Sequence, residues 1–222
     1  MKAGKFLCIA SFLMVISLAA AEVKAAGDIT LPEPETRGKL SVEEALNMRR
    51  SRSEYGYQIL NLRDLSQILW STQAVSSVWG GRVAVDSARA KYPLEIYVVV
   101  GAVEKLKPGV YHYIPTTHRL VKGGETDVRK ALANAAMGQK MLVKAPAIIV
   151  IAAFFSPSIK AYGTRGTRYV YIRAGYVGQN IYIQAEALNL ATSAIGAFDD
   201  KKVKEALGIK TEPLILYPVT GR

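Results

Sequence analysis

Continuous apolar stretches alternate with longer amphipathic segments along the chain. The three apolar stretches are residues 94–100 (LEIYVVV), 147–155 (AIIVIAAFF) and 212–219 (EPLILYPV). Runs of this length without polar alternation are typical of strands that are covered on both faces. Between the first two, residues 109–114 and 119–122 flank Pro115-Thr116-Thr117 and predict a hairpin.

Helices are predicted before the first of these strands and between the later ones. Ser41 and Glu44 form a capping box that opens a helix ending near Met48. The spacing of apolar residues predicts further helices over residues 61–72, 127–137, 167–190 and 199–208. In the longest of them, Gly175 and Gly178 lie one turn apart, where small residues let another element or a ligand approach closely.

Buried strands separated by helices, together with one hairpin, predict an α+β fold built on one central sheet. A chain of 222 residues is sufficient for a single domain of ordinary size. Residues 27–40, which include Pro32 and Pro34, are interpreted as an extended lead-in that a compact domain need not order. The predicted domain therefore covers residues 41–222.

The first 26 residues have the pattern of a secretory signal peptide. Lys2 and Lys5 precede the apolar run FLCIASFLMVISLAAA, and small residues follow up to Ala26. This pattern predicts export, to the periplasm or the exterior, with no membrane span after the signal is removed. A retained membrane anchor is the alternative, but the run barely reaches the length that crosses a bilayer.

Few residues of the chain suit metal or thiol chemistry. Cys8 is the only cysteine and lies in the predicted signal peptide, so the remainder has no disulfide, thiolate nucleophile or cysteine-based zinc site. His112 and His118 lie on the predicted hairpin without a recognised ligand spacing. We interpret them as ordinary surface residues and predict no metal site.

The net charge of +11 indicates affinity for anions. Residues 1–26 carry Lys2, Lys5 and Lys24 against Glu22, a net +2, so their removal leaves +9. Such a chain attracts nucleic acid, an acidic membrane surface or a phosphorylated ligand. The cations are scattered, with no basic tail and no aromatic-basic interleaving, so no nucleic-acid partner is predicted.

Residues 48–55 read MRRSRSEY and concentrate basic and hydroxyl side chains after the first helix. Guanidinium groups bind phosphate oxygens through parallel hydrogen bonds and serine adds a donor, so Arg49-Arg50-Ser51 suits a terminal phosphate. The alternative is that Arg49, Arg50 and Arg52 bond the free carbonyls at the end of the helix. The chain lacks the GxGxxG, P-loop and GxSxG signatures of other nucleotide and hydrolase sites.

The order of several segments resembles the nitroreductase family, and most closely its branch of azoline-oxidising dehydrogenases from peptide-modification systems. They are the capped helix ending in RRS, a Ser-Ala-x-Ala loop before LEIYVVV, the stretch YGTRGTRYVYIRAGYVGQNIYIQAEALNLATSAIGAFDD and a strand ending in PVTGR. The resemblance covers residues 41–222. It implies a mixed or antiparallel sheet flanked by helices, and a homodimer that holds FMN between its subunits. It also implies electron transfer from NAD(P)H to a small-molecule acceptor by alternating half-reactions.

The resemblance further implies which residues contact FMN. The RRS segment matches the family's phosphate and ribityl contacts, the Ser-Ala loop lies beside the flavin rings, and the Ile-Gly pair faces the isoalloxazine through its backbone. No side-chain acid, base or nucleophile is implied, so no catalytic residue is assigned. The predicted cofactor-binding residues are Arg49, Arg50, Ser51, Ser53, Ser87, Ala88, Arg89, Ile195 and Gly196.

Departures from the family pattern keep alternatives open. Arg89 replaces a glycine near the flavin edge, where it either stabilises an anionic reduced flavin or points to solvent. The Lys-Tyr pair of the azoline-oxidising branch is Ala161-Tyr162 here, with Lys160 displaced by one position, which argues against azoline oxidation. Asn189 replaces the glycine that ends the long helix and tolerates the left-handed conformation. The alternative function is a non-catalytic module, with or without flavin, that binds an anionic partner.

Overall fold

The computed structural model describes residues 28–53, 58–76, 82–83 and 93–222. The predicted signal peptide, residues 1–26, lies outside the described residues, as do Ser87, Ala88 and Arg89 of the predicted flavin loop. None of the helices in the described part of the chain has both the length and the hydrophobicity needed to cross a membrane.

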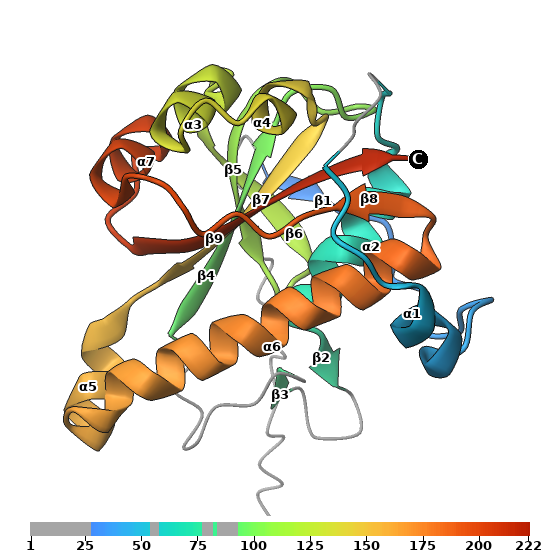
Figure 1. Cartoon of the computed structure of the whole chain (residues 1–222). Helices are drawn as coiled ribbons and strands as arrows, with labels where there is room; N and C mark the ends of the chain where they lie inside the picture. Colours follow the sequence, from blue (N-terminus) through green and yellow to red (C-terminus); the bar gives the residue numbers. More distant parts are fainter. Residues whose placement is uncertain (1–27, 54–57, 77–81, 84–92) are drawn as a thin grey trace, which may run out of the picture.

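A seven-stranded sheet forms the centre of the molecule (Figure 1). Its order is β1-β6-β5-β4-β7-β9-β8, and each of these pairs is antiparallel. A small antiparallel pair, β2 and β3, lies apart from it. The strands are β1 Asp28–Thr30, β2 Val75–Ser76, β3 Arg82–Val83, β4 Leu94–Val100, β5 Gly109–Ile114, β6 Arg119–Gly124, β7 Ala147–Ala153, β8 Leu190–Thr192 and β9 Glu212–Gly221.

Helices cover both faces of this sheet. Figure 1 shows α2 and the long α6 on one face, and α3, α4 and α7 on the other. The α+β fold with a central sheet flanked by helices is therefore confirmed. The helices are α1 Val42–Met48, α2 Leu62–Thr72, α3 Arg129–Ala135, α4 Lys140–Lys144, α5 Phe155–Tyr162, α6 Arg165–Ala187 and α7 Asp200–Leu207.

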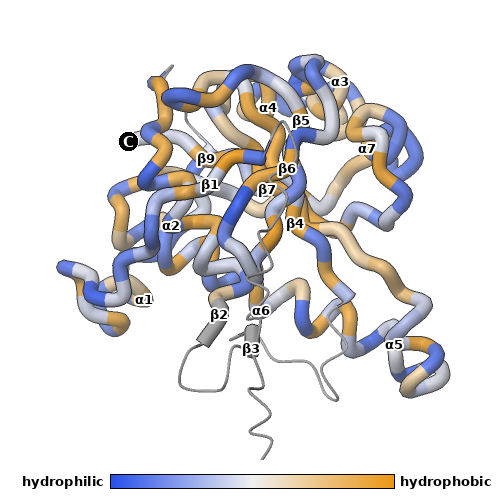
Figure 2. The backbone as a smooth tube through the Cα atoms, turned by 180° about the vertical axis from the view of Figure 1, so that it is seen from behind, coloured by the Kyte–Doolittle hydropathy of each residue, from blue (hydrophilic) through white to orange (hydrophobic). Residues whose placement is uncertain are grey.

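The central strand β7 explains why its sequence is apolar throughout. Ile149 and Ile151 pack with α2 and α6, whereas Ile148 and Val150 pack with α3, α4 and α7. Every residue of β7 is buried. Figure 2 shows the same division, with hydrophobic stretches along the central strands and hydrophilic residues along α7. Covering on both faces removes the polar alternation that a half-exposed strand would have.

Three predicted elements have wrong boundaries. The helix predicted over 167–190 is α6, Arg165–Ala187, and Leu190 begins β8. The strand predicted over 147–155 ends at Ala153, and α5 begins at Phe155, because the apolar run continues past the point where the chain leaves the sheet. The helix predicted over 127–137 ends at Ala135. Met137 and Gly138 both have positive φ, +56° and +76°, and reverse the chain before α4.

The segment before α1 is held against the domain. Its first residues form β1, which pairs with β6 at the edge of the sheet. Leu31 is buried, the Pro32 carbonyl accepts a hydrogen bond from Ser66 on α2, and the Glu35 amide donates to Gln67. Residues 28–35, part of the segment interpreted from the sequence as a lead-in that need not be ordered, are thus held by backbone pairing at the sheet edge and by contacts with α2.

The interpretation of both histidines as ordinary surface residues is wrong. His118 is half-buried, with Nε2 2.7 Å from Ser66 Oγ and Nδ1 2.9 Å from the Tyr113 hydroxyl. Burial lowers the pKa of the His118 imidazole. His112 is also half-buried and stacks on Tyr97 with ring centroids 4.8 Å apart. Both imidazoles pack between neighbouring elements, which the local hairpin sequence does not indicate.

Candidate cofactor site

The RRS segment begins where α1 ends. The capping box that opens α1 is present, because Glu44 N donates to Ser41 Oγ over 3.1 Å and Ser41 N donates to Glu44 Oε2 over 2.8 Å. The last helical residue is Met48, and the Arg49 amide donates to the Ala45 carbonyl. From Arg49 onward the described segment, residues 49–53, has no regular secondary structure. Its shape must therefore come from contacts with other elements.

The first two arginines of this segment behave differently. Arg50 Nη1 donates to the carbonyls of Asn47 at 3.1 Å and of Arg49 at 2.8 Å, which is the helix-end role that the sequence left open. Arg49 Cζ lies 5.1 Å from the centre of the Tyr182 ring, in cation–π geometry. Arg49 is therefore directed toward α6, while Arg50 uses part of its guanidinium at the end of α1.

Tyr182 connects two of the predicted cofactor segments. Its hydroxyl lies 2.8 Å from Ser51 Oγ and accepts a hydrogen bond of 2.8 Å from the Ala194 amide. Ala194 immediately precedes Ile195 and Gly196. A single side chain on α6 thus brings the RRS segment beside the second predicted loop, although the two are more than 130 residues apart in the sequence.

The loop after β8 is anchored to β9 and open on its outer side. Ile195 is buried, and it exchanges backbone hydrogen bonds of 2.9 Å in both directions with Leu216. Gly196 is exposed, and a side chain at this position would meet no atom within 4 Å. A rigid backbone beside open space is suitable for a planar ligand that approaches the main chain closely.

Glu186 lies beneath the RRS segment and is almost completely buried. Its Oε1 accepts hydrogen bonds from the Arg50 amide at 3.3 Å and from Arg52 Nη2 at 3.4 Å, and its Oε2 accepts one from Arg222 Nη2. Two guanidinium groups, those of Arg52 and Arg222, thus pair with one carboxylate, and the cations Arg49 and Arg50 belong to the same segment as Arg52. The local charge is strongly positive.

Sequence reasoning missed Tyr182 and Glu186. They lie four residues apart, on one face of α6, and both are polar although the helix is largely apolar on the faces that pack. Two polar residues four positions apart in this helix were the sequence signal that could have identified them. Of the other predicted residues, Ser53 is exposed and follows Arg52 in the same segment. Ser87, Ala88 and Arg89 lie outside the described residues, so their position relative to Tyr182 remains a prediction.

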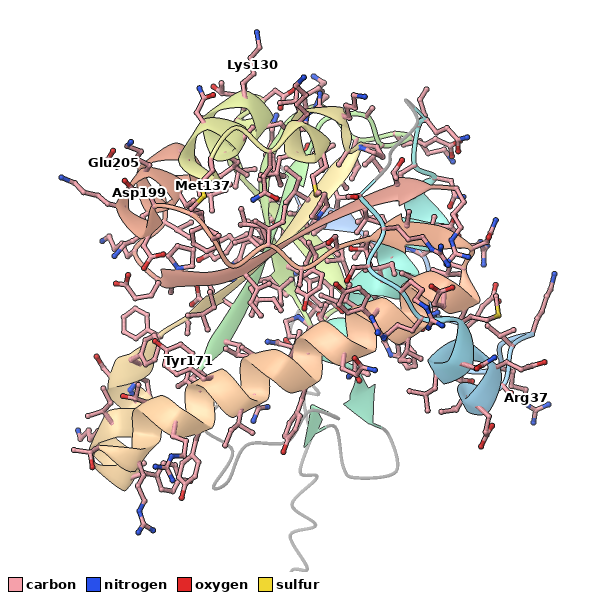
Figure 3. All side chains as sticks on the ribbon, in the orientation of Figure 1. Arg37, Lys130, Met137, Tyr171, Asp199 and Glu205 are labelled. Atoms are coloured by element: carbon pink, nitrogen blue, oxygen red, sulfur yellow. The ribbon has the colours of Figure 1, made fainter. Side chains whose placement is uncertain are left out.

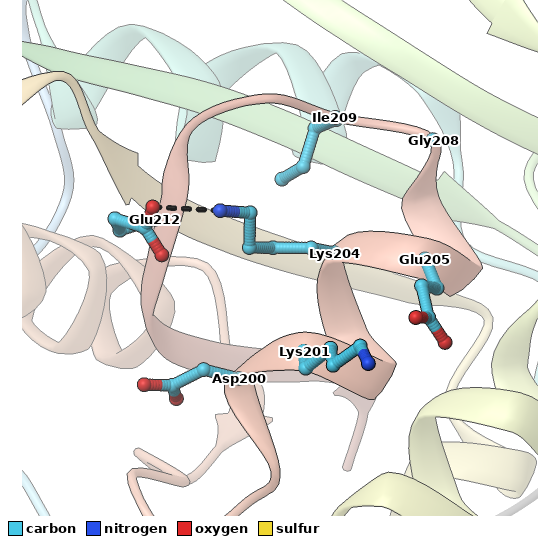
Figure 4. A pocket seen from close by; sticks show the side chains of 7 residues that line it. All are labelled: Asp200, Lys201, Lys204, Glu205, Gly208, Ile209 and Glu212. Carbon is cyan, nitrogen blue, oxygen red and sulfur yellow. Dashed lines mark hydrogen bonds and ion pairs between the residues drawn. The ribbon is translucent and has the colours of Figure 1, made fainter.

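Three surface cavities lie away from these residues. One of about 500 Å³ is formed by α7 and the start of β9, where Lys204 pairs with Glu212 at 2.6 Å (Figure 4). Another, of about 410 Å³, includes Tyr97 and His112, and a third, of about 210 Å³, includes Arg129. The linings of these three cavities contain none of the predicted cofactor residues.

Comparison with known proteins establishes the family. The family model for the nitroreductase family matches residues 46–222. The chain belongs to the nitroreductase family. A Methanocaldococcus jannaschii protein that is a nitroreductase by name is 42% identical over 192 residues, which cover 86% of this chain and 95% of that protein.

Solved structures agree with this membership. A nitroreductase by name from Anabaena variabilis superposes with a TM-score of 0.77 at 26% identity over 87% of this chain. The match spans only 41% of the Anabaena chain. A chain of the Escherichia coli microcin synthetase McbBCD complex with truncated pro-MccB17 shares the fold, with a TM-score of 0.67 at 20% identity over 96% of this chain and 84% of that chain.

Proposed function

We propose that this nitroreductase-family oxidoreductase depends on FMN and binds the FMN phosphate at Arg49, Arg50 and Ser51. The observation that carries the proposal is the Tyr182 hydroxyl, which lies within 2.8 Å of both Ser51 Oγ and the Ala194 amide. The two segments that the family resemblance assigns to opposite ends of the cofactor are therefore neighbours.

The chemistry of the donors fits a phosphate dianion. Guanidinium groups and a serine hydroxyl are donors that bind phosphate oxygens by charge-assisted hydrogen bonds. Arg52 Nε adds a buried donor that has no hydrogen-bond partner within the described part of the chain. The carboxylate of Glu186, which would repel a phosphate, is neutralised by its own pairs with Arg52 and Arg222.

When bound, FMN supplies the redox chemistry. The described residues supply binding and orientation: Arg49 and Ser51 hold the phosphate end, and the main chain at Ile195 and Gly196 faces the ring system. Because the cofactor supplies the redox chemistry and the protein supplies binding, no side-chain nucleophile is required. The electron donor we propose is NAD(P)H, and the acceptor is a small molecule.

The proposal includes a homodimer and export. Tyr169, Ile172 and Tyr176 follow helical spacing along α6 and are exposed, which is the pattern of a helix face that packs against a partner. Tyr171, on the same helix, is also exposed, and its ring meets that of Phe155 on α5 edge-on with centroids 5.6 Å apart (Figure 3). Export rests on the signal-peptide pattern of residues 1–26.

The direct test is the cofactor content of the purified mature protein. We expect a yellow protein that releases FMN on denaturation and bleaches when a reductant is added without oxygen. Arg49→Ala with Arg50→Ala should lower FMN occupancy and leave the circular dichroism spectrum unchanged, because only surface donors are lost. Lys130→Ala is the matched control, since Lys130 is an exposed cation on α3, on the opposite side of the molecule (Figure 3).

Each failure of this test has a distinct meaning. A colourless protein that cannot be reconstituted with FMN would remove the flavoenzyme proposal. A protein that binds FMN but is not reduced by any donor would favour the non-catalytic flavin module. Normal occupancy in the double variant would show that the arginines serve only the end of α1.

A further inference from the structure

A buried ion cluster lies under the segment that carries the predicted phosphate ligands. Its centre is Glu186, in the last turn of α6, whose side chain is only 3% exposed. A carboxylate is costly to bury unless charged or hydrogen-bonded partners compensate for the lost water. Both oxygens of Glu186 have such partners, and the partners come from two distant parts of the chain, near residue 50 and at the C-terminus.

The contacts of Glu186 fix the main chain of the RRS segment, not only its side chains. Glu186 Oε1 accepts the backbone N–H of Arg50, and two residues later the backbone N–H of Arg52 donates to the Thr192 carbonyl of β8 over 2.9 Å. These two amides hold the irregular segment on its inner side. Ser51, between them, directs its hydroxyl to Tyr182.

The C-terminal residue completes the cluster. In β9, Gly221 pairs with Leu190 of β8, so the chain end lies beside the last turn of α6. Arg222 Nε donates to the Leu190 carbonyl over 3.2 Å, and Arg222 Nη2 donates to Glu186 Oε2. The ladder between β8 and β9 therefore sets the position of the guanidinium that holds the Glu186 carboxylate.

We propose that Glu186 is a positioning residue for the FMN phosphate site and that Arg222 holds it in place. This inference rests on the proposed function, because it concerns the same phosphate. Glu186 orients the Arg50 amide and the Arg52 side chain, and through them the segment that carries the donors of Arg49 and Ser51. The carboxylate touches no cofactor itself.

The direction in which Glu186→Gln changes FMN affinity distinguishes a positioning role of Glu186 from a purely electrostatic one. A carboxylate repels a phosphate dianion, so if Glu186 acted only through its charge, Glu186→Gln would tighten FMN binding. Positioning predicts the opposite. We expect Glu186→Gln and Arg222→Ala each to raise the FMN dissociation constant about tenfold, the scale of losing a hydrogen bond to a charged group. The double variant should also lose about tenfold, because both changes break the same cluster.

The experiment combines FMN titration with amide hydrogen exchange in the FMN-free protein. Exchange of the peptide covering residues 49–53 should quicken in both single variants, while peptides from β7 keep wild-type rates. Glu205→Gln is the matched control, because Glu205 is an exposed carboxylate on α7. Arg222→Ala removes a partner of Glu186 and leaves the carboxylate itself in place, so it serves where Glu186→Gln impairs folding.

The outcomes of the proposed function and of this inference are distinguishable. Tighter or unchanged FMN binding in Glu186→Gln, with unchanged exchange at residues 49–53, overturns the positioning role and leaves the flavoenzyme proposal intact. A hundredfold loss in the double variant shows independent effects and overturns the shared cluster. A wild-type protein that binds no FMN overturns the proposed function and the positioning role together.

Discussion

Gly178 on α6 lies against Tyr217 of β9, and this contact makes a quantitative prediction. A Cβ at position 178 would overlap the Tyr217 hydroxyl oxygen and lie 3.1 Å from the ring carbon that bears it. Tyr217 is only 3% exposed and meets the Tyr182 ring edge-on, with centroids 5.6 Å apart. Gly178→Ala must therefore displace a buried ring that itself packs on the tyrosine of the candidate site.

Gly175 provides the reference for the size of this effect. It lies one turn earlier on α6, and a Cβ there would meet no atom within 4 Å. Replacing glycine by alanine inside a helix gains about 1 kcal/mol in either position. The difference between Gly178→Ala and Gly175→Ala thus cancels helix propensity and leaves the overpacking term, about 1–3 kcal/mol. For a domain of this size, 2 kcal/mol corresponds to roughly 4–8 °C in melting temperature.

Thermal and urea unfolding of the two variants measures this difference. We expect Gly175→Ala to be as stable as the wild type or more stable, and Gly178→Ala to be less stable than Gly175→Ala by about 2 kcal/mol. Adding Tyr217→Phe to Gly178→Ala should recover most of the loss, because the overlapping oxygen is removed. Equal stability of the two alanine variants, or no recovery with phenylalanine, would refute the packing argument.

Three further changes test other contacts. Tyr182→Phe removes the hydroxyl between Ser51 and Ala194 but keeps the ring. FMN binding measured by fluorescence should weaken about fivefold, near 1 kcal/mol. Unchanged affinity would show that the Tyr182 hydroxyl does not support the FMN site. The free energy of unfolding should decrease as the pH falls from about 6.5 to 5, because burial lowers the pKa of His118 in the folded protein and the unfolded chain therefore binds the proton at a higher pH. In His118→Gln the free energy of unfolding should depend less on pH over this range. An equally strong dependence in the variant would contradict a role for His118. Asn189 has a φ of +55°, so Asn189→Ala should cost about 1 kcal/mol in urea unfolding and Asn189→Gly much less, whereas equal losses would contradict a backbone origin.

The sequence predicted those parts of the fold that local pattern determines. The strand β7 is apolar at every position because helices cover both of its faces, and α1 begins at its capping box. Asn189 adopts the left-handed conformation that the comparison with a family glycine implied. Boundaries failed where one pattern continued through two elements, as in the apolar run that ends β7 and starts α5.

The candidate site could be predicted only in part, because its contacts are non-local. The family resemblance assigned Ser51 and the Ile195-Gly196 loop to one cofactor, and the structure brings them together at Tyr182. Local sequence could not show this, since Tyr182 and Glu186 meet the RRS segment across 131 and 136 residues of chain. The sequence also does not show that Arg49 contacts Tyr182 while Arg50 bonds carbonyls at the end of α1, because both residues follow the same helix end.

The measurement that tests the central claim most directly is the affinity of the purified protein for FMN relative to riboflavin, which differs from FMN only by lacking the phosphate. We expect the wild type to bind FMN far more tightly, and the ratio of the two affinities to shrink when Arg49 and Arg50 are both replaced by alanine. Equal affinity for the two flavins, or a ratio that the double replacement leaves unchanged, would contradict a phosphate site at the end of α1.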